Sequence, residues 1–197
     1  MPAFVAFLDS CVLYLATLRD VLLTIAEAGI CQIKWSADVL DEVEKALVSR
    51  TTVTNPKEAL AGAKYLRGIM EDAFPEAMVE QYSYANLEPY VGNHADDRHV
   101  LAAAIAARAD VLVTCNIKHF PPDICCRYGI EVQTPDIFLL FQFELAPDRF
   151  LVLLDKLSRE RHEPMNSVQA ILSALMRTTP KFSHLALSTW RSQSRRE

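Results

Sequence analysis

The sequence predicts an α/β domain with a mostly parallel central sheet flanked by helices, followed by a helical C-terminal extension. Short apolar runs of β-forming residues predict strands at 4–8, 110–114 and 130–133. The segments between these strands carry apolar residues three and four positions apart, which is typical of amphipathic helices. From about residue 145 onward only helical spacing remains. We therefore expect a sheet-containing domain over 1–145 and a helical extension over 146–197.

The first expected helices begin or end at residues suited to those places. A helix over 11–28 should stop at Gly29, because glycine readily adopts the left-handed conformation that often follows a helix. Ser36 can cap the next helix by accepting a hydrogen bond from a free backbone N–H group. Pro56 can open a third helix over 56–73, since its fixed backbone angle suits the first helical turn.

The later helices carry similar signals. An alanine-rich helix is expected over 100–109, where small side chains permit close packing on a sheet. Thr134, Pro135 and Asp136 then supply a cap, a rigid first residue and an acid for the first turn of another helix. The extension is expected to hold helices over 150–157 and 168–176, before a polar, arginine-rich end at 191–197.

Composition excludes several classes of protein. The 197 residues are 51% hydrophobic and 23% charged, with 5 Gly and 10 Pro, which excludes disordered and collagen-like chains. No apolar run is long enough to span a membrane, and five cysteines without a CxxC pair suggest a reducing compartment. We therefore expect a cytoplasmic protein. Because the net charge is −5, contact with nucleic acid should be local or act through a metal.

Polar residues stand at the ends of several buried elements. Asp9 ends the first strand, Asn116 follows the second, Glu42 lies in the second helix, and Asp97 begins the alanine-rich helix. Sites in parallel sheets form beyond the carboxyl ends of the strands, so the three acids could converge there. Such a cluster would repel itself unless a cation neutralised it, and oxygen ligands favour Mg²⁺ or Mn²⁺. These ions bind phosphate oxygens, which makes a phosphodiester substrate natural.

Four blocks of sequence resemble those of the PIN domain family, in the family's order and spacing. The blocks are FLDSCVLY at 7–14, WS with LDEV between 35 and 43, DDRHVLAAA at 96–104 and LVTCNIKHF at 112–120. The resemblance covers about residues 4–140. Within the family, the chain looks most like VapC-type toxins, the ribonuclease half of bacterial type II toxin-antitoxin pairs. Longer members of that group also carry a helical extension like the one expected here.

The resemblance implies a metal-dependent endoribonuclease that hydrolyses RNA phosphodiester bonds. Asp9, Glu42 and Asp97 match the family's acidic metal-binding positions, for Mg²⁺ or Mn²⁺. Asn116 matches the fourth catalytic position, where it would orient water or substrate, and Thr114 precedes it as an accessory residue. The partners implied are RNA, a small cognate antitoxin protein and a second copy of the chain in a homodimer. No membrane partner is implied.

Two positions depart from the family's pattern. Many relatives carry Asp where this chain has Asn116, and relatives often carry a further acid where it has His94. We therefore expect weaker metal affinity than in those relatives, with a second metal ion in doubt. Asp96 could compensate in part for the lost charge, or could cap the following helix.

Each singled-out residue also has a plainer interpretation. Glu42 by itself resembles a solvated helix acid, and Asp41 and Glu44 compete with it for a metal-binding role. A zinc site formed by the cysteines around 115–126 and His119 is disfavoured by their spacing, so we expect His119 to pack beside Phe120. Aromatic residues of the loop-like 82–90 segment could stack on bases or simply pack, namely Tyr82, Tyr84 and Tyr90.

Two other functions are compatible with parts of the sequence. A phosphatase of the haloacid dehalogenase type also opens with a strand that ends in Asp, but it needs a second Asp where this chain has Cys11. The other alternative is a non-catalytic PIN-like module that binds RNA or protein. Asn116 and His94 favour that alternative, whereas the three retained acids oppose it, because a buried acidic cluster is costly without a cation.

Overall fold

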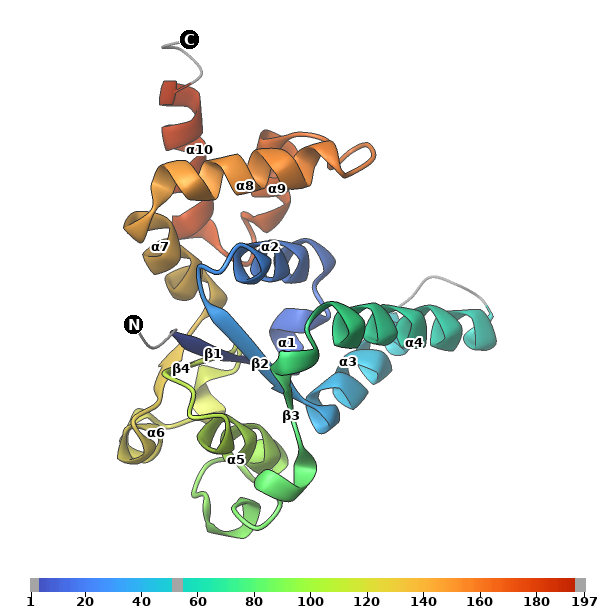
Figure 1. Ribbon diagram of the computed structural model, residues 1–197, viewed down its shortest axis with the longest axis vertical. Helices are drawn as coiled ribbons and strands as arrows, with labels where there is room; N and C mark the ends of the chain where they lie inside the picture. Colours follow the sequence, from blue (N-terminus) through green and yellow to red (C-terminus); the bar gives the residue numbers. More distant parts are fainter. Residues whose placement is uncertain (1–3, 51–54, 194–197) are drawn as a thin grey trace. The chain divides into compact units, whose positions relative to one another are not determined.

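The computed structural model describes residues 4–50 and 55–193, which form two compact units. The first unit contains residues 1–15 and 31–132, and the second contains residues 16–30 and 133–197. The second unit is therefore built from two separate stretches of the chain (Figure 1). The predicted domain boundary at residue 145 stays a prediction. Each unit is described by itself below.

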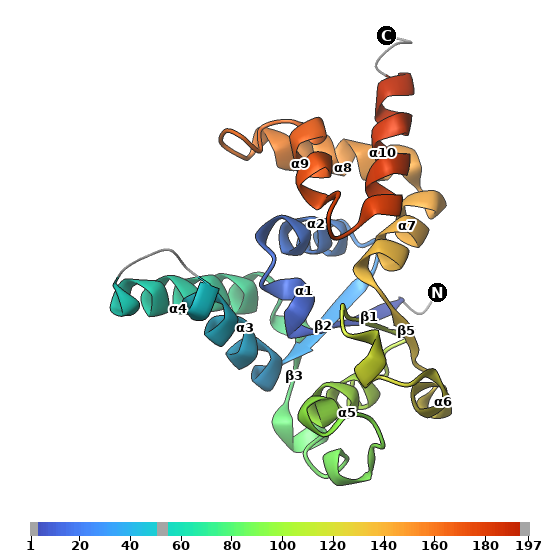
Figure 2. The ribbon, with the colours of Figure 1, turned by 180° about the vertical axis from the view of Figure 1, so that it is seen from behind.

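A five-stranded parallel sheet forms the centre of the first unit. Its strands are β1 (Val5–Leu8), β2 (Gln32–Ser36), β3 (Met78–Val79), β4 (Val111–Val113) and β5 (Glu131–Gln133), in the order β3-β2-β1-β4-β5 (Figure 2). The central strand β1 pairs in parallel with β2 and with β4, and Phe7 lies opposite Lys34 and Leu112. The predicted fold class, with its mostly parallel sheet and helical C-terminal part, is confirmed.

The strand order places a natural binding position at the carboxyl end of β1. The chain runs from β1 outward through β2 to β3, and then returns to the other side of β1 with β4. Ligand sites of open α/β sheets lie at such a reversal, where the loops that follow the two neighbouring strands diverge. The residues directly after β1 and β4 are therefore the first place to look for a site.

Three local predictions were wrong. Strand β2 was not predicted, because Gln32 and Lys34 alternate with Ile33 and Trp35 and so leave no continuous apolar run. Strand β3 was not predicted either, since it has only two residues. The single helix expected over 11–28 is two helices, α1 (Ser10–Leu13) and α2 (Ala16–Glu27). Apolar spacing continues across that break, so periodicity carries no signal of it.

The other helices of the first unit flank the sheet. They are α3 (Ala37–Arg50), α4 (Pro56–Ala73), α5 (Arg98–Ala106) and α6 (Pro122–Cys125). The capping predictions hold, because Ser36 Oγ accepts a hydrogen bond from Val39 N at 3.3 Å and Pro56 is the first residue of α4. The alanine-rich α5 packs on β2 with its residues 100–104 buried. Single 3₁₀ turns connect these elements, at 75–77, 81–83, 88–90, 95–97, 117–119 and 126–128.

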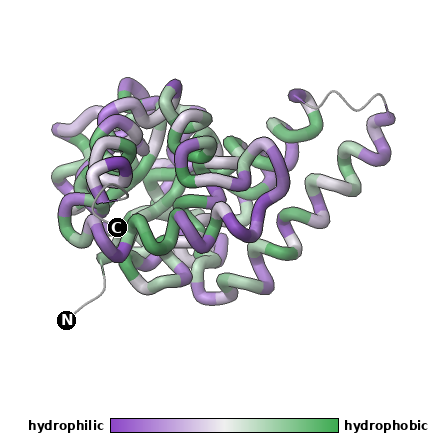
Figure 3. Tube along the Cα trace, turned by 90° about the horizontal axis from the view of Figure 1, so that it is seen from above, coloured by the Kyte–Doolittle hydropathy of each residue, from purple (hydrophilic) through white to green (hydrophobic). Residues whose placement is uncertain are grey.

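Helices α3 and α4 pack side by side. Arg67 of α4 holds the pair together, since its guanidinium contacts Asp41 at 2.5 Å and Glu44 at 3.0 Å across the interface. It also contacts Glu71 on its own helix at 2.8 Å. Hydrophobic and hydrophilic residues alternate along both helices, as amphipathic helices require (Figure 3).

Apart from Gln133, the last residue of β5, the regular structure described in the second unit is helical. It combines α2 with α7 (Pro135–Leu145), α8 (Pro147–Arg159), α9 (Val168–Leu175) and α10 (Pro180–Gln193). Gly29 follows α2 with a φ of +70°, as predicted, and Thr134 caps α7 by accepting a hydrogen bond from Ile137 N at 3.3 Å. Helix α10, part of which is buried, was not predicted, because a polar end was expected over 191–197. Residues 194–197 of that expected end lie outside the described residues.

Three aromatic rings form the core of the second unit. Phe143, Phe150 and Phe182 lie with ring centroids 5.3–5.9 Å apart in tilted and edge-to-face arrangements. Asp136, buried in the first turn of α7, accepts a hydrogen bond from Phe182 N at 3.0 Å. The backbone at the start of α10 is thus fixed to α7 at the point where its aromatic side chain enters the core.

Among residues 4–50 and 55–193, no helix is long and apolar enough to cross a membrane.

Removing the central ring should destabilise this helical unit. Phe182→Ala should lower the free energy of unfolding by about 3–5 kcal/mol, because it leaves a cavity between two other rings. Phe141→Ala is the matched control, since Phe141 is 47% exposed, and it should change stability by less than about 0.5 kcal/mol. Urea unfolding followed by circular dichroism measures both. Equal effects of the two substitutions would contradict the assigned core.

Candidate active site

Asp9 lies directly after β1, where the strand order predicts a site. Its side chain is only 3% exposed, and its backbone N–H donates to Val113 O of β4 at 3.1 Å. Its carboxylate does not cap α1. Instead Oδ2 accepts hydrogen bonds from Thr114 Oγ1 at 2.6 Å and Cys11 Sγ at 3.1 Å, and Oδ1 accepts one from Ser10 Oγ at 3.2 Å. The carboxylate is therefore held in one orientation by its neighbours.

Thr114 joins Asp9 to the loop that follows β4. The threonine is fully buried, and its hydroxyl donates to Asp9 while accepting a hydrogen bond from Asn116 N at 2.9 Å. Cys115 N in the same loop donates to Cys11 Sγ at 3.0 Å. The loops after β1 and β4 are thus hydrogen-bonded to each other, and Asn116 is connected to Asp9 through Thr114.

Glu42, on α3, is paired with a histidine that sequence reasoning did not single out. Its Oε1 lies 3.2 Å from Nε2 of His99 on α5. Burial alone would raise the pKa of Glu42, but hydrogen bonds from His99 and Ser10 outweigh it and lower that pKa. Burial would likewise lower the pKa of His99, but Glu42 outweighs it and raises that pKa. His99 lies two residues after Asp97, inside the DDRHVLAAA block at 96–104. Its place in that block was the sequence signal that could have identified it as a residue of the site.

Asp97 lies at the N-terminal end of α5 and contacts His119 across the site. Its Oδ2 is 2.6 Å from His119 Nδ1, and Asn116 Nδ2 is 2.7 Å from the same nitrogen. The His119 ring stacks on that of His94 with centroids 4.1 Å apart. The expectation that His119 packs beside Phe120 was wrong, because its imidazole is engaged by Asp97 and Asn116. Asp96, the expected accessory residue, has an exposed side chain.

Hydrogen bonds and close contacts relate the four residues predicted to form the site. Thr114 links Asp9 to the backbone of Asn116. Asn116 Nδ2 and Asp97 Oδ2 both lie within hydrogen-bonding distance of His119 Nδ1, whereas Glu42 pairs with His99. The three acids do not themselves form a compact ligand group. Among the described residues, only His94, Asp97 and His119 have ligand atoms that all lie within 4.8 Å of one another.

The site is negatively charged. Within the described part of the chain Asp9 forms no ion pair, although it is buried. A hydrogen bond to Cys115, burial and the charge of Asp9 together raise the pKa of the Cys11 thiol.

A pocket of about 330 Å³ beside Glu42 is lined mostly by polar residues, namely Asp38, Asp41, Lys45, Gln81, Glu88 and His99. Carboxylates outnumber cationic side chains along this pocket, and carboxylate oxygens are ligands that divalent cations such as Mg²⁺ prefer.

The three tyrosines of the 82–90 segment have different surroundings. Tyr84 is buried, and its hydroxyl donates to Asp38 Oδ2 at 2.5 Å, so it is a packing residue. Tyr82 and Tyr90 are 83% and 81% exposed. Only these two leave a ring face available for a base to stack on.

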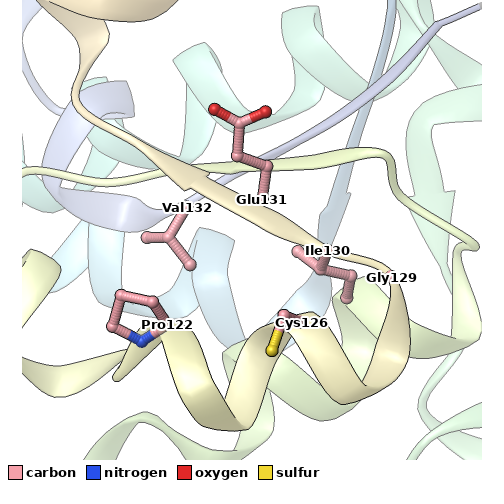
Figure 4. Close-up of a pocket in the computed structure, with 6 residues that line it drawn as sticks. All are labelled: Pro122, Cys126, Gly129, Ile130, Glu131 and Val132. Atoms are coloured by element: carbon pink, nitrogen blue, oxygen red, sulfur yellow. The ribbon is translucent and has the colours of Figure 1, made fainter.

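A second pocket, of about 390 Å³, lies beside β5 and is separate from the residues of the site. Figure 4 shows it between the strand and the α6 segment, with Glu131 pointing to the opposite side of the strand from Val132. None of the predicted site residues lines it. Cys125 is buried, while Cys126 lines this pocket, and the described residues place neither in a cluster that could bind a metal.

The sequence profile of the PIN domain matches residues 5–118, more than half of the chain, and the chain therefore belongs to the PIN domain family. Among curated proteins, it is 37% identical over 102 residues to the "Putative ribonuclease VapC50" of Mycobacterium tuberculosis (strain ATCC 25618 / H37Rv). The match covers 52% of this chain and 60% of the relative, so the chain spans less than two-thirds of that protein's length. No solved structure matches the chain.

The pair of Glu42 and His99 should make stability depend on pH in a defined window. The pKa of His99 is raised in the folded protein. Its contribution to the free energy of unfolding is therefore full below the pKa of the unfolded chain, about 6.5, and is lost as pH rises through the folded pKa. Because the pKa of Glu42 is lowered, its contribution is present above about 4.3 and is lost as pH falls through the folded pKa. The pair therefore stabilises most between these values.

A double-mutant cycle measures this coupling. Glu42→Gln and His99→Gln, singly and together, should show a larger coupling energy at about pH 5.5 than at about pH 9 in urea unfolding without divalent cations. His184→Gln removes an exposed histidine and should leave the pH profile of stability unchanged. A coupling energy that does not vary with pH would contradict an ionic pair.

Proposed function

We propose that the protein is a Mg²⁺- or Mn²⁺-dependent endoribonuclease that hydrolyses RNA phosphodiester bonds, and that it is the toxin of a bacterial type II toxin-antitoxin pair. The observation that carries the proposal is the placement of Asp9 and Asn116 after β1 and β4, joined through Thr114, with Asp97 and Asn116 both reaching His119 at the carboxyl end of the sheet. Membership of the PIN domain family and the printed name of the relative support it.

Each acid has a distinct place in the proposed mechanism. Asp9, Glu42 and Asp97 would hold the ion, and Thr114 keeps the Asp9 carboxylate in its orientation through a 2.6 Å hydrogen bond. When bound there, Mg²⁺ or Mn²⁺ would supply Lewis-acid activation of water and neutralise charge on the phosphate. The Asn116 amide, fixed at its backbone by Thr114, would orient the attacking water or the substrate.

Two neighbouring residues would assist the acids. His99 carries a raised pKa beside Glu42, so it favours the protonated form and would stabilise the charged carboxylate. Tyr82 and Tyr90, exposed in the segment that adjoins the acidic pocket, offer ring faces on which unpaired bases can stack. This arrangement favours single-stranded or looped RNA, whose bases are free to stack.

Cleavage of RNA tests the catalytic proposal. The purified protein should cleave single-stranded or looped RNA when Mg²⁺ or Mn²⁺ is present, and a chelator should abolish cleavage. Asp9→Asn and Asp97→Asn should lose most of the activity while keeping the fold, as judged by circular dichroism. Asp72→Asn removes an exposed acid of α4 and serves as the matched control. Cleavage at an equal rate without divalent cation would exclude the mechanism, and absence of any cleavage would favour a non-catalytic binding module.

The partners proposed are RNA, a small antitoxin protein and a second copy of the chain, all acting in the cytoplasm. A lysine or arginine of the antitoxin that reached Asp9, Glu42 and Asp97 would replace the positive charge of the metal, which makes inhibition electrostatically reasonable. A homodimer is the commonest symmetric assembly and would present two such sites.

Growth experiments test the antitoxin partner. Expression of the wild-type chain in a bacterial host should slow growth, because uncontrolled RNA cleavage stops protein synthesis. Co-expression of the small protein encoded beside it should restore growth, and Asp9→Asn should not slow growth at all. If the wild-type chain is harmless while it cleaves RNA in vitro, the toxin proposal fails and the nuclease proposal stands.

A further inference from the structure

Two imidazoles and one carboxylate meet at the Asp97 end of the site. Asp97 Oδ2 lies 2.6 Å from His119 Nδ1 and 3.7 Å from His94 Nδ1, and the ligand atoms of the three residues all lie within 4.8 Å of one another. In a tetrahedral zinc site with bonds of about 2.1 Å, ligand atoms stand about 3.4 Å apart. The two imidazole rings are stacked with centroids 4.1 Å apart, so both rings would have to turn about their side-chain bonds before the three atoms faced one ion.

The surroundings of His119 Nδ1 show a conflict between hydrogen-bonding partners. Asp97 Oδ2 only accepts, so it requires the nitrogen to donate, whereas Asn116 Nδ2 at 2.7 Å only donates and requires the same nitrogen to accept. A half-turn of the amide would present its oxygen to that point instead. The Asp97 and Asn116 oxygens would then share the single Nδ1–H of His119 as a donor, and a cation bound in place of that proton would satisfy all three atoms.

The backbone holds this cluster together without help from an ion. His94 N donates to His119 O at 3.1 Å, and Asp97 N donates to His94 O at 3.0 Å. Asn93 Nδ2 donates to Asp97 O at 2.9 Å, and His119 N donates to Asn116 O at 2.9 Å. The two loops that carry the ligands are therefore joined to each other, so binding of an ion would require side chains to turn but little ordering of the backbone.

We infer that His94, Asp97 and His119 form a binding site for a transition-metal ion of the zinc type, with the Asn116 amide oxygen as a fourth ligand. Imidazole nitrogen suits Zn²⁺ and related ions, whereas Mg²⁺ prefers an all-oxygen octahedron. The ion would replace the 2.6 Å hydrogen bond between His119 Nδ1 and Asp97 Oδ2 and the 3.4 Å hydrogen bond from Asp96 N to His94 Nδ1. The inference goes beyond the proposed function, with which it shares Asp97 and Asn116.

Direct binding measurements test this site. Co²⁺, used as a spectroscopic substitute for Zn²⁺, should give the intense visible absorption of a tetrahedral site when added to the full-length protein. Zn²⁺ should displace it, and Mg²⁺ in excess should not. In titration calorimetry, His94→Ala and His119→Ala should each weaken Zn²⁺ binding by at least about tenfold. His94 is exposed, so its substitution is compatible with folding.

Two control variants separate this site from other cation binding. Asp9→Asn leaves the three ligands in place, so it should weaken Zn²⁺ binding far less than His94→Ala does. His184→Ala removes an exposed histidine of the second unit and should leave Zn²⁺ affinity unchanged. Absence of the Co²⁺ spectrum, or a spectrum that survives both His94→Ala and His119→Ala, would overturn the inference.

The outcome is independent of RNA cleavage. A protein that shows the Co²⁺ spectrum but never cleaves RNA keeps this site and loses the proposed function. A protein that cleaves RNA with Mg²⁺ but binds neither Zn²⁺ nor Co²⁺ keeps the proposed function. In that case His119 acts only as a hydrogen-bonding partner of Asp97.

Discussion

The hydrogen bond between Thr114 and Asp9 is the interaction on which the site depends. It joins the ends of β1 and β4, the two strands at which the order of the sheet reverses, and it fixes a buried carboxylate that has no basic partner among the described residues. The Thr114 hydroxyl also accepts a hydrogen bond from Asn116 N. This bond fixes the loop after β4, so that the Asn116 side chain lies beside His119. Since a buried unpaired acid is costly, the surrounding donors are what make this position tolerable.

Sequence reasoning succeeded where a feature depends on nearest neighbours along the chain. The N-terminal ends of α4 and α7 follow from Pro56 and from Thr134 with Pro135. The C-terminal end of α2 follows from Gly29. It failed where tertiary packing decides. Gln32 and Lys34 interrupt the apolar run of β2, yet pairing with β1 makes that segment a strand. Helix α10 likewise owes its order to burial of Phe182 against other aromatic rings.

For the site, the sequence indicated which residues matter but not how they are connected. Asp9, Glu42, Asp97 and Asn116 could be chosen from spacing and family resemblance, because each borders an apolar element. The histidines could not, since a single imidazole in a sequence has no preferred role. His99 acquires its role from Glu42 on another helix, and His119 acquires its role from Asp97, 22 positions away. These pairings depend on the approach of α3, α5 and the loop after β4.

The insertion of α2 into the C-terminal helical unit has a consequence for how the chain matures. Leu18, Leu22 and Ile25 are buried in a unit whose remaining helices are made only after residue 133. During synthesis, this apolar face leaves the ribosome long before its partners exist and must wait uncovered. A chain that ended after the sheet would never cover it. The C-terminal helices therefore complete a structure begun near the N-terminus, and a prematurely terminated chain would expose surface that chaperones and proteases recognise.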